Sequence, residues 1–160
     1  MWQQARNRFE DARDAVRAMR AARAELDAFE DGEWNGRYRS SDGVTVRTGR
    51  VGDPTAAAAR CRQENGPRLT RRYDLLAVEI ERAMAVVRAV ATHSQREAAA
   101  CALYYLAEGA DEKPPTYEDV ARQLSEAEGH EVTPGAARAR VKYACKWIEA
   151  NGGWYALAHA

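Results

Sequence analysis

Long cationic side chains near the C-terminal end are the residues of this sequence best suited to chemistry. Arg138, Arg140, Lys142 and Lys146 fall within one short stretch in which Glu149 is the only acid. At 3.6 residues per turn, apolar residues occupy the opposite side of a predicted helix: Val141, Ala144, Cys145 and Ile148. Arg and Lys side chains on an exposed helix face bind phosphate oxygens and the acceptor edges of guanine. The pattern therefore predicts binding of a polyanion rather than covalent chemistry.

The start of this helix is marked by Thr133-Pro134, because Thr is a good N-cap and Pro is tolerated at the first helical position. Small residues then share the outward face with the lysines, which suits entry into a major groove about 12 Å wide. The expected DNA contacts on this helix are Thr133, Gly135, Arg138, Arg140, Lys142 and Lys146. Arg138 and Lys142 are the foremost candidates. The alternative is an ordinary three-helix bundle whose last helix has a solvated basic face.

Two shorter helices must hold the cationic helix in place. Ser94-Gln-Arg-Glu97 has the pattern of a capping box, and Thr116-Tyr-Glu-Asp119 repeats it with Asp in place of Glu, which predicts a weaker box. Ala121 supplies the small side chain that two crossing helices need at their closest approach. The second helix is expected to end near Glu126, leaving a long turn over 126–132. Its carboxylates, Glu126, Glu128 and Glu131, would repel phosphates. Residues 92–150 thus predict a helix-turn-helix domain.

The N-terminal part of the sequence predicts long amphipathic helices. Residues 2–30 lack Gly and Pro, and their apolar residues recur at steps of three and four. Residues 53–91 predict a helical arm, with one helix ending at Gly66-Pro67 and a second running from Arg68 to Ala91. A single apolar stripe on a long helix needs a partner. We expect an antiparallel helical hairpin, which leaves open a coiled coil or a homodimer.

Residues 31–52 are rich in glycine and arginine and interrupt the helical pattern. Arg37 and Arg39 alternate with Trp34 and Tyr38, and a basic arm with aromatic residues is able to follow a phosphate backbone. The alternative is a solvated loop. At the other end, residues 151–160 form an apolar tail that is expected to dock on the core or on a partner.

The composition narrows the class of protein. The sequence has 160 residues, a formal net charge of zero and 46% hydrophobic residues. Ala and Arg are abundant, which favours an all-α fold over a sheet. No apolar run approaches the length of about 20 residues that spans a bilayer, so no membrane partner and a cytoplasmic location are expected. The three cysteines form no CxxC pair, and no catalytic motif appears. We therefore expect no enzyme activity, no cofactor and no metal.

Several short motifs resemble known families. Leu103-Tyr-Tyr-Leu-Ala-Glu-Gly109, followed by Thr116-Tyr-Glu-Asp-Val-Ala-Arg-Gln-Leu124, resembles region 4 of bacterial sigma factors. Ser40-Ser41 and Val51-Gly-Asp-Pro-Thr-Ala56, upstream of a long helix, resemble the ArpU/RinA-type transcriptional regulators of phages and prophages. The resemblance extends over 40–148 and implies a sequence-specific activator of phage late genes, with its recognition helix at 134–146. The long turn over 126–132 and the apolar tail depart from the family pattern.

Two functions follow as expectations. The first is a DNA-binding transcriptional regulator of a phage or prophage, acting on double-stranded DNA as a homodimer in the bacterial host cell. The second is a helical protein-interaction module, either one that binds RNA polymerase or a phage packaging protein similar to a small terminase subunit.

Overall fold

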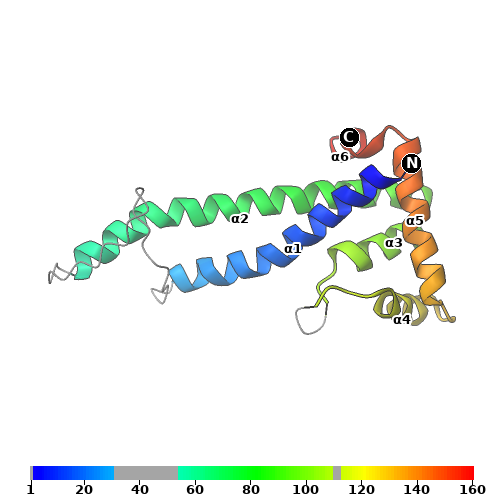
Figure 1. Ribbon diagram of the computed structural model, residues 1–160, viewed down its shortest axis with the longest axis horizontal. Coiled ribbons are helices and arrows are strands. Elements are labelled where there is room, and N and C mark those ends of the chain that lie inside the picture. Colours follow the sequence, from blue (N-terminus) through cyan, green and yellow to red (C-terminus); the bar gives the residue numbers. More distant parts are fainter. Residues whose placement is uncertain (1, 31–53, 110–112) are drawn as a thin grey trace. The chain divides into compact units, whose positions relative to one another are not determined.

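The computed structural model describes residues 2–30, 54–109 and 113–160, and these residues are helical with no strand among them. The helices are α1 (Gln3–Glu30), α2 (Pro54–His93), α3 (Gln95–Cys101), the π-helical turn η1 (Ala102–Leu106), α4 (Tyr117–Glu128), α5 (Pro134–Ala150) and α6 (Gly153–Ala158) (Figure 1). The predicted all-α fold is confirmed. The Gly- and Arg-rich segment 31–52, with Arg37 and Arg39, lies outside the described residues.

The chain divides into two compact units. The first comprises residues 1–18 and 76–160, and the second comprises residues 19–75. The unit that contains residues 92–150, for which the sequence predicts a helix-turn-helix, also includes the part of α2 from residue 76 onward. It also includes the start of α1 and the tail. Helices α1 and α2 each contribute to both units.

In the second unit, the predicted helix break at Gly66-Pro67 is wrong. Helix α2 is continuous through Pro67. Proline removes one backbone donor from a helix, which is a local cost that tertiary packing is able to outweigh. Here Gly66 lies against the Phe29 ring, where an added Cβ would come within 3.3 Å of Cε1. Arg72 also pairs with Glu25 across the two helices at 3.2 Å. These contacts run antiparallel, as the hairpin prediction requires.

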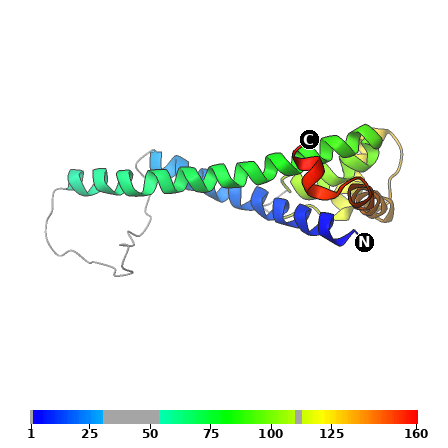
Figure 2. The ribbon, with the colours of Figure 1, turned by 90° about the horizontal axis from the view of Figure 1, so that it is seen from above.

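The first unit has one apolar core to which α1 and α2 both contribute. On α1 the core residues are Ala5, Phe9 and Ala12, and on α2 they are Ala83, Val86 and Val90. All six are almost completely buried, and the two chain segments run in opposite directions (Figure 2). The alanines allow the helix backbones to approach closely. The predicted stripe on α1 therefore has a partner within its own chain.

Phe9 is the centre of this core. Its ring stacks on Tyr105 of η1, with centroids 4.9 Å apart, and meets the edge of Trp154 of α6 at 4.8 Å. Burial of an aromatic side chain of this size contributes strongly to stability. The core thus joins the start of α1 to the helices that follow α2.

Candidate nucleic-acid interface

Helix α3 begins at Ser94, whose hydroxyl accepts a hydrogen bond from the Glu97 N–H at 3.4 Å. The predicted capping box is only half formed here. The Ser94 N–H donates to the Val90 carbonyl at 2.8 Å, so it does not need the Glu97 carboxylate. Helix α2 therefore passes into α3 with its backbone bonds almost uninterrupted.

A π-helical turn ends this helix and orients two consecutive tyrosines. The Ala107 N–H donates to the Ala102 carbonyl at 2.9 Å, five residues back. Tyr105 points into the core, whereas Tyr104 stacks on Tyr117 with centroids 4.1 Å apart. Such turns are rare and change the direction of neighbouring side chains. In this protein the turn brings η1 into contact with the first residue of α4.

Arg13 of α1 completes this contact. Its guanidinium lies 4.6 Å from the Tyr104 ring centroid and donates to the Pro115 carbonyl at 3.1 Å. The loop that leads into α4 is thus held both by the stacked rings of Tyr104 and Tyr117 and by the Arg13 guanidinium.

Helix α4 begins with a complete capping box. The Thr116 N–H donates to Asp119 at 3.0 Å, and the Asp119 N–H donates to the Thr116 hydroxyl at 3.3 Å. Hydrogen bonds from Thr116 hold the pKa of Asp119 below its ordinary value. The box with Asp, which the sequence predicted to be the weaker of the two, is the one that forms fully.

The turn between α4 and α5 is shorter than expected, because α4 continues to Glu128. Gly129 then adopts a left-handed conformation with φ of 70°. The Val132 N–H donates to the Ser125 hydroxyl at 2.8 Å, and Thr133 caps α5 by accepting from the Ala136 N–H at 3.2 Å. Only residues 129–133 connect the two helices, which approaches the short turn typical of a helix-turn-helix.

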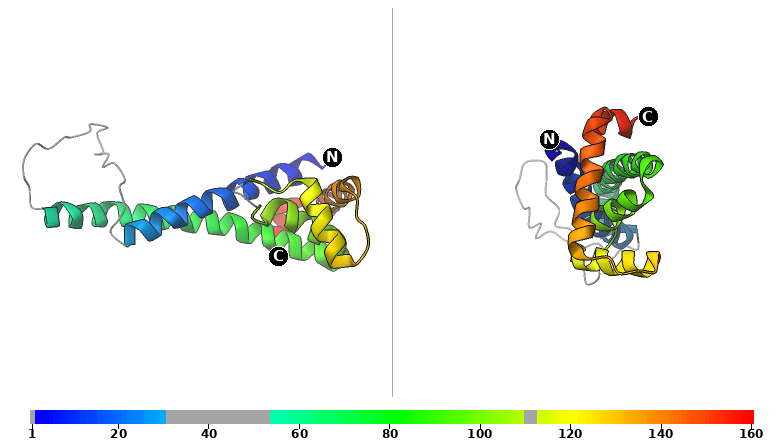
Figure 3. Two further views of the ribbon diagram at one scale, coloured as in Figure 1. Left: turned by 90° about the horizontal axis from the view of Figure 1, so that it is seen from below. Right: turned by 90° about the vertical axis from the view of Figure 1, so that its right-hand side faces the viewer.

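Helix α5 buries one side and exposes the other. Its buried residues are Ala137, Val141, Ala144, Cys145 and Ile148. Figure 3 shows α5 in front of the other helices of its unit when the molecule is seen from the right-hand side of Figure 1. Small and cationic residues lie on this open side, as the sequence predicted.

Three of the predicted contact residues are exposed cations. Arg138, Lys142 and Lys146 all have exposed side chains, and none of them forms an ion pair within the described part of the chain. Gly135 and Thr133 are exposed at the start of the same helix. The structure therefore brings these five residues together along one helix.

Arg140 differs from the other cations that the sequence predicts as DNA contacts. Its guanidinium forms two hydrogen bonds with the Glu128 carboxylate, at 2.5 and 3.0 Å, and only 17% of its side chain is exposed. Arg140 thus joins α4 to α5 and, unlike Arg138, Lys142 and Lys146, has a carboxylate partner within the described residues. The same pair neutralises Glu128, one of the carboxylates expected to repel DNA. Hydrogen bonds from Arg140 hold the pKa of Glu128 below its ordinary value.

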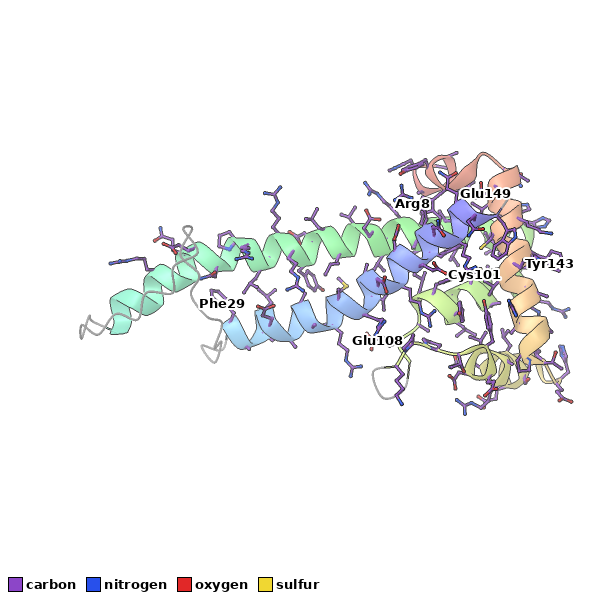
Figure 4. All side chains as sticks on the ribbon, in the orientation of Figure 1. Arg8, Phe29, Cys101, Glu108, Tyr143 and Glu149 are labelled. Atoms are coloured by element: carbon purple, nitrogen blue, oxygen red, sulfur yellow. The ribbon has the colours of Figure 1, made fainter. Side chains whose placement is uncertain are left out.

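Sequence reasoning missed Tyr143, which lies on the outward face of α5 and is 57% exposed. Figure 4 shows it at the outer edge of the helix, directed away from its neighbours. The Lys146 ammonium lies 5.9 Å from its ring centroid. The helical spacing could have placed Tyr143 on this face, because it follows Ala139 by four residues and precedes Lys146 by three.

The tail docks on the core. Trp154 of α6 is buried against Phe9, and α6 contacts α5. Arg8 of α1 also lies over the Tyr155 ring at 5.1 Å and donates to its hydroxyl. Arg138, Lys142 and Lys146 remain exposed in the presence of this tail.

The start of α1 lies beside α5. The Ala5 N–H donates to the Glu149 carboxylate at 2.7 Å, and Figure 4 shows Glu149 next to the first turns of α1. The Lys142 ammonium lies 5.8 Å from the Trp2 ring centroid. The start of α1 thus lies beside the cationic helix α5, although the two are far apart in the sequence.

Cys101 and Cys145 are buried free thiols; burial raises the pKa of Cys101 and raises the pKa of Cys145 to about 12. Residues 2–30, 54–109 and 113–160 contain no group of three or more metal-binding side chains. Within the same ranges, no helix combines the length and apolar character that crossing a bilayer requires.

Comparisons with protein-family models, curated proteins and solved structures find no match for this chain.

Proposed function

We propose that this protein is a sequence-specific DNA-binding regulator of transcription, of the type encoded by phages and prophages. The single observation that carries the proposal is a set of exposed cations on the outward face of α5 that form no ion pair with any other described residue: Arg138, Lys142 and Lys146. Their arrangement supports insertion of α5 into a major groove, with α3 and α4 behind it.

Roles follow from the positions on the helix. Gly135 and Ala139 leave room for the α5 backbone to approach the bases, while Lys142 and Lys146 extend toward phosphates or guanine edges. Thr133 at the N-cap lies where recognition helices enter the groove. We propose that two copies act as a homodimer that reads half-sites about one helical turn apart.

The decisive experiment compares two double variants in titrations with duplex DNA. Arg138→Ala with Lys142→Ala removes two proposed contacts, so the affinity is expected to fall at least tenfold at moderate salt. The matched control, Arg71→Ala with Arg88→Ala, removes two exposed arginines of α2 and is expected to bind nearly as well as the unmodified protein. Equal affinity of both double variants would reject the proposal. Selection of bound fragments from random DNA then identifies the target.

A protein partner is the second candidate function. The exposed Tyr143 favours it, because aromatic side chains are enriched at protein interfaces. RNA polymerase or a phage packaging component would be the partner. A ring-sized oligomer in light scattering, together with partner binding that does not depend on salt, would support this candidate over the regulator.

A further inference from the structure

Trp2, the residue immediately before α1, lies close to two cations. Its ring centroid is 5.6 Å from the Arg6 guanidinium of α1 and 5.8 Å from the Lys142 ammonium of α5. Cation–π contacts of this kind hold flexible side chains in place. Arg6 and Lys142 are thereby held on a common surface although they come from distant parts of the sequence.

Arg138 lies one turn before Lys142 on α5, and its side chain is exposed as well. The two cations at the Trp2 ring, Arg6 and Lys142, therefore lie beside the exposed side of α5 that carries Arg138.

Two carboxylates, Glu149 and Glu10, form contacts with this part of α1. Glu149 accepts the Ala5 N–H, so that backbone donor is not free for an anion and the side chains must supply the attraction. Glu10 pairs with Arg6 at 2.8 Å, but both side chains are nearly half exposed, at 45% and 44%. An exposed pair of this kind contributes little. A phosphate group is therefore able to replace Glu10 as the partner of Arg6.

We propose that Trp2 and Arg6 extend the DNA-binding surface of α5, contacting the phosphate backbone beside the groove that α5 enters. This inference rests on the proposed DNA-binding function. It assigns to α1 a role in binding as well as in the core, and it requires no residue of the segment 31–52.

The test measures how the affinity for a fixed DNA duplex depends on salt, using the full chain. Arg6→Ala is expected to lower the affinity severalfold and to reduce the slope of log affinity against log salt by about one, because one phosphate contact is lost. Trp2→Ala is expected to weaken binding, whereas Trp2→Phe retains a ring for the two cations. The control is Arg17→Ala, an exposed arginine three turns further along α1, which is expected to leave the slope unchanged.

A gain of affinity provides a second test that does not depend on a damaging substitution. Glu10→Gln removes the competing carboxylate from Arg6 and is expected to strengthen binding. If Arg6→Ala and Glu10→Gln both leave affinity and slope unchanged while the Arg138/Lys142 double variant binds weakly, this inference fails and the proposed function stands. If the double variant also binds normally, both fail. A loss of affinity in Arg6→Ala without a change in slope would also overturn the inference.

Discussion

Arg140 and Glu128 are twelve positions apart in sequence, and each of the two carboxylate oxygens accepts a hydrogen bond from a different guanidinium nitrogen. The pair links the last residue of α4 to the second turn of α5. Two parallel bonds fix the relative direction of both side chains, which a single contact would not. This contact therefore helps to fix the angle between α4 and α5.

Stability at low pH is expected to depend on Glu128. Its pKa is lowered in the folded state, so the ion pair contributes fully above the ordinary Glu pKa of about 4.3 and is lost as the pH falls through the folded-state value. The unmodified protein is therefore expected to lose more stability on acidification than Glu128→Gln. Urea unfolding at a series of pH values measures the difference. Identical pH dependence in both proteins would contradict this role.

Arg140→Met separates a structural role from a DNA contact. It removes the Arg140 partner of the Glu128 carboxylate, which is only 15% exposed and keeps His130 at 3.1 Å, so a lower thermal midpoint is expected. The salt slope of DNA binding, measured below that midpoint, is expected to stay unchanged. Arg138→Ala should show the reverse, with a normal midpoint and a smaller slope. A reduced slope in Arg140→Met would restore Arg140 as a phosphate contact.

Gly129→Ala tests the turn between α4 and α5. Gly129 has φ of 70°, and a Cβ added there meets no atom within 4 Å. The cost is therefore purely conformational and is expected to be about 1 kcal/mol of unfolding free energy. Asn tolerates this conformation better, so Gly129→Asn should be less harmful. Chemical denaturation of the two variants gives the values, and equal stability of Gly129→Ala and the unmodified protein would show that the turn relaxes.

Ala121→Leu tests the crossing of α4 with α5. Ala121 is 3% exposed, so a larger side chain must displace its neighbours, at an expected cost of about 1–3 kcal/mol. Ala127→Leu makes the same change at an exposed position of α4 and is expected to alter stability by no more than about 0.5 kcal/mol. Thermal unfolding of both variants distinguishes a tight crossing from a loose one.

Sequence alone located the features that depend on local chemistry. Thr133-Pro134 marked the start of α5, and the spacing of Val141 and Ile148 identified its buried side, because caps and helical periodicity act within a few residues. The same rules placed Arg138 and Lys142 on the exposed side. Thr116 and Asp119 were also located as a cap, although the strength of the box was misjudged.

Features that depend on partners distant in sequence were not predictable in this way. Pro67 predicted a break, because nothing local shows that Gly66 packs against Phe29. Arg140 was grouped with the DNA contacts, because its pairing with Glu128 depends on where α4 ends. The position of Trp2 beside Lys142 required the fold itself. In each case a tertiary contact decided the role of a side chain, and the local sequence pattern had suggested a different role.

The core around Phe9 has a consequence for the order of events during synthesis. Phe9 is synthesised well before its partners Tyr105 and Trp154, which follow about a hundred or more positions later. Contacts this distant in sequence are slow to form and leave apolar surface uncovered in the meantime. The apolar side of α1 around Phe9 is therefore fully covered only once Trp154 of α6 has been synthesised.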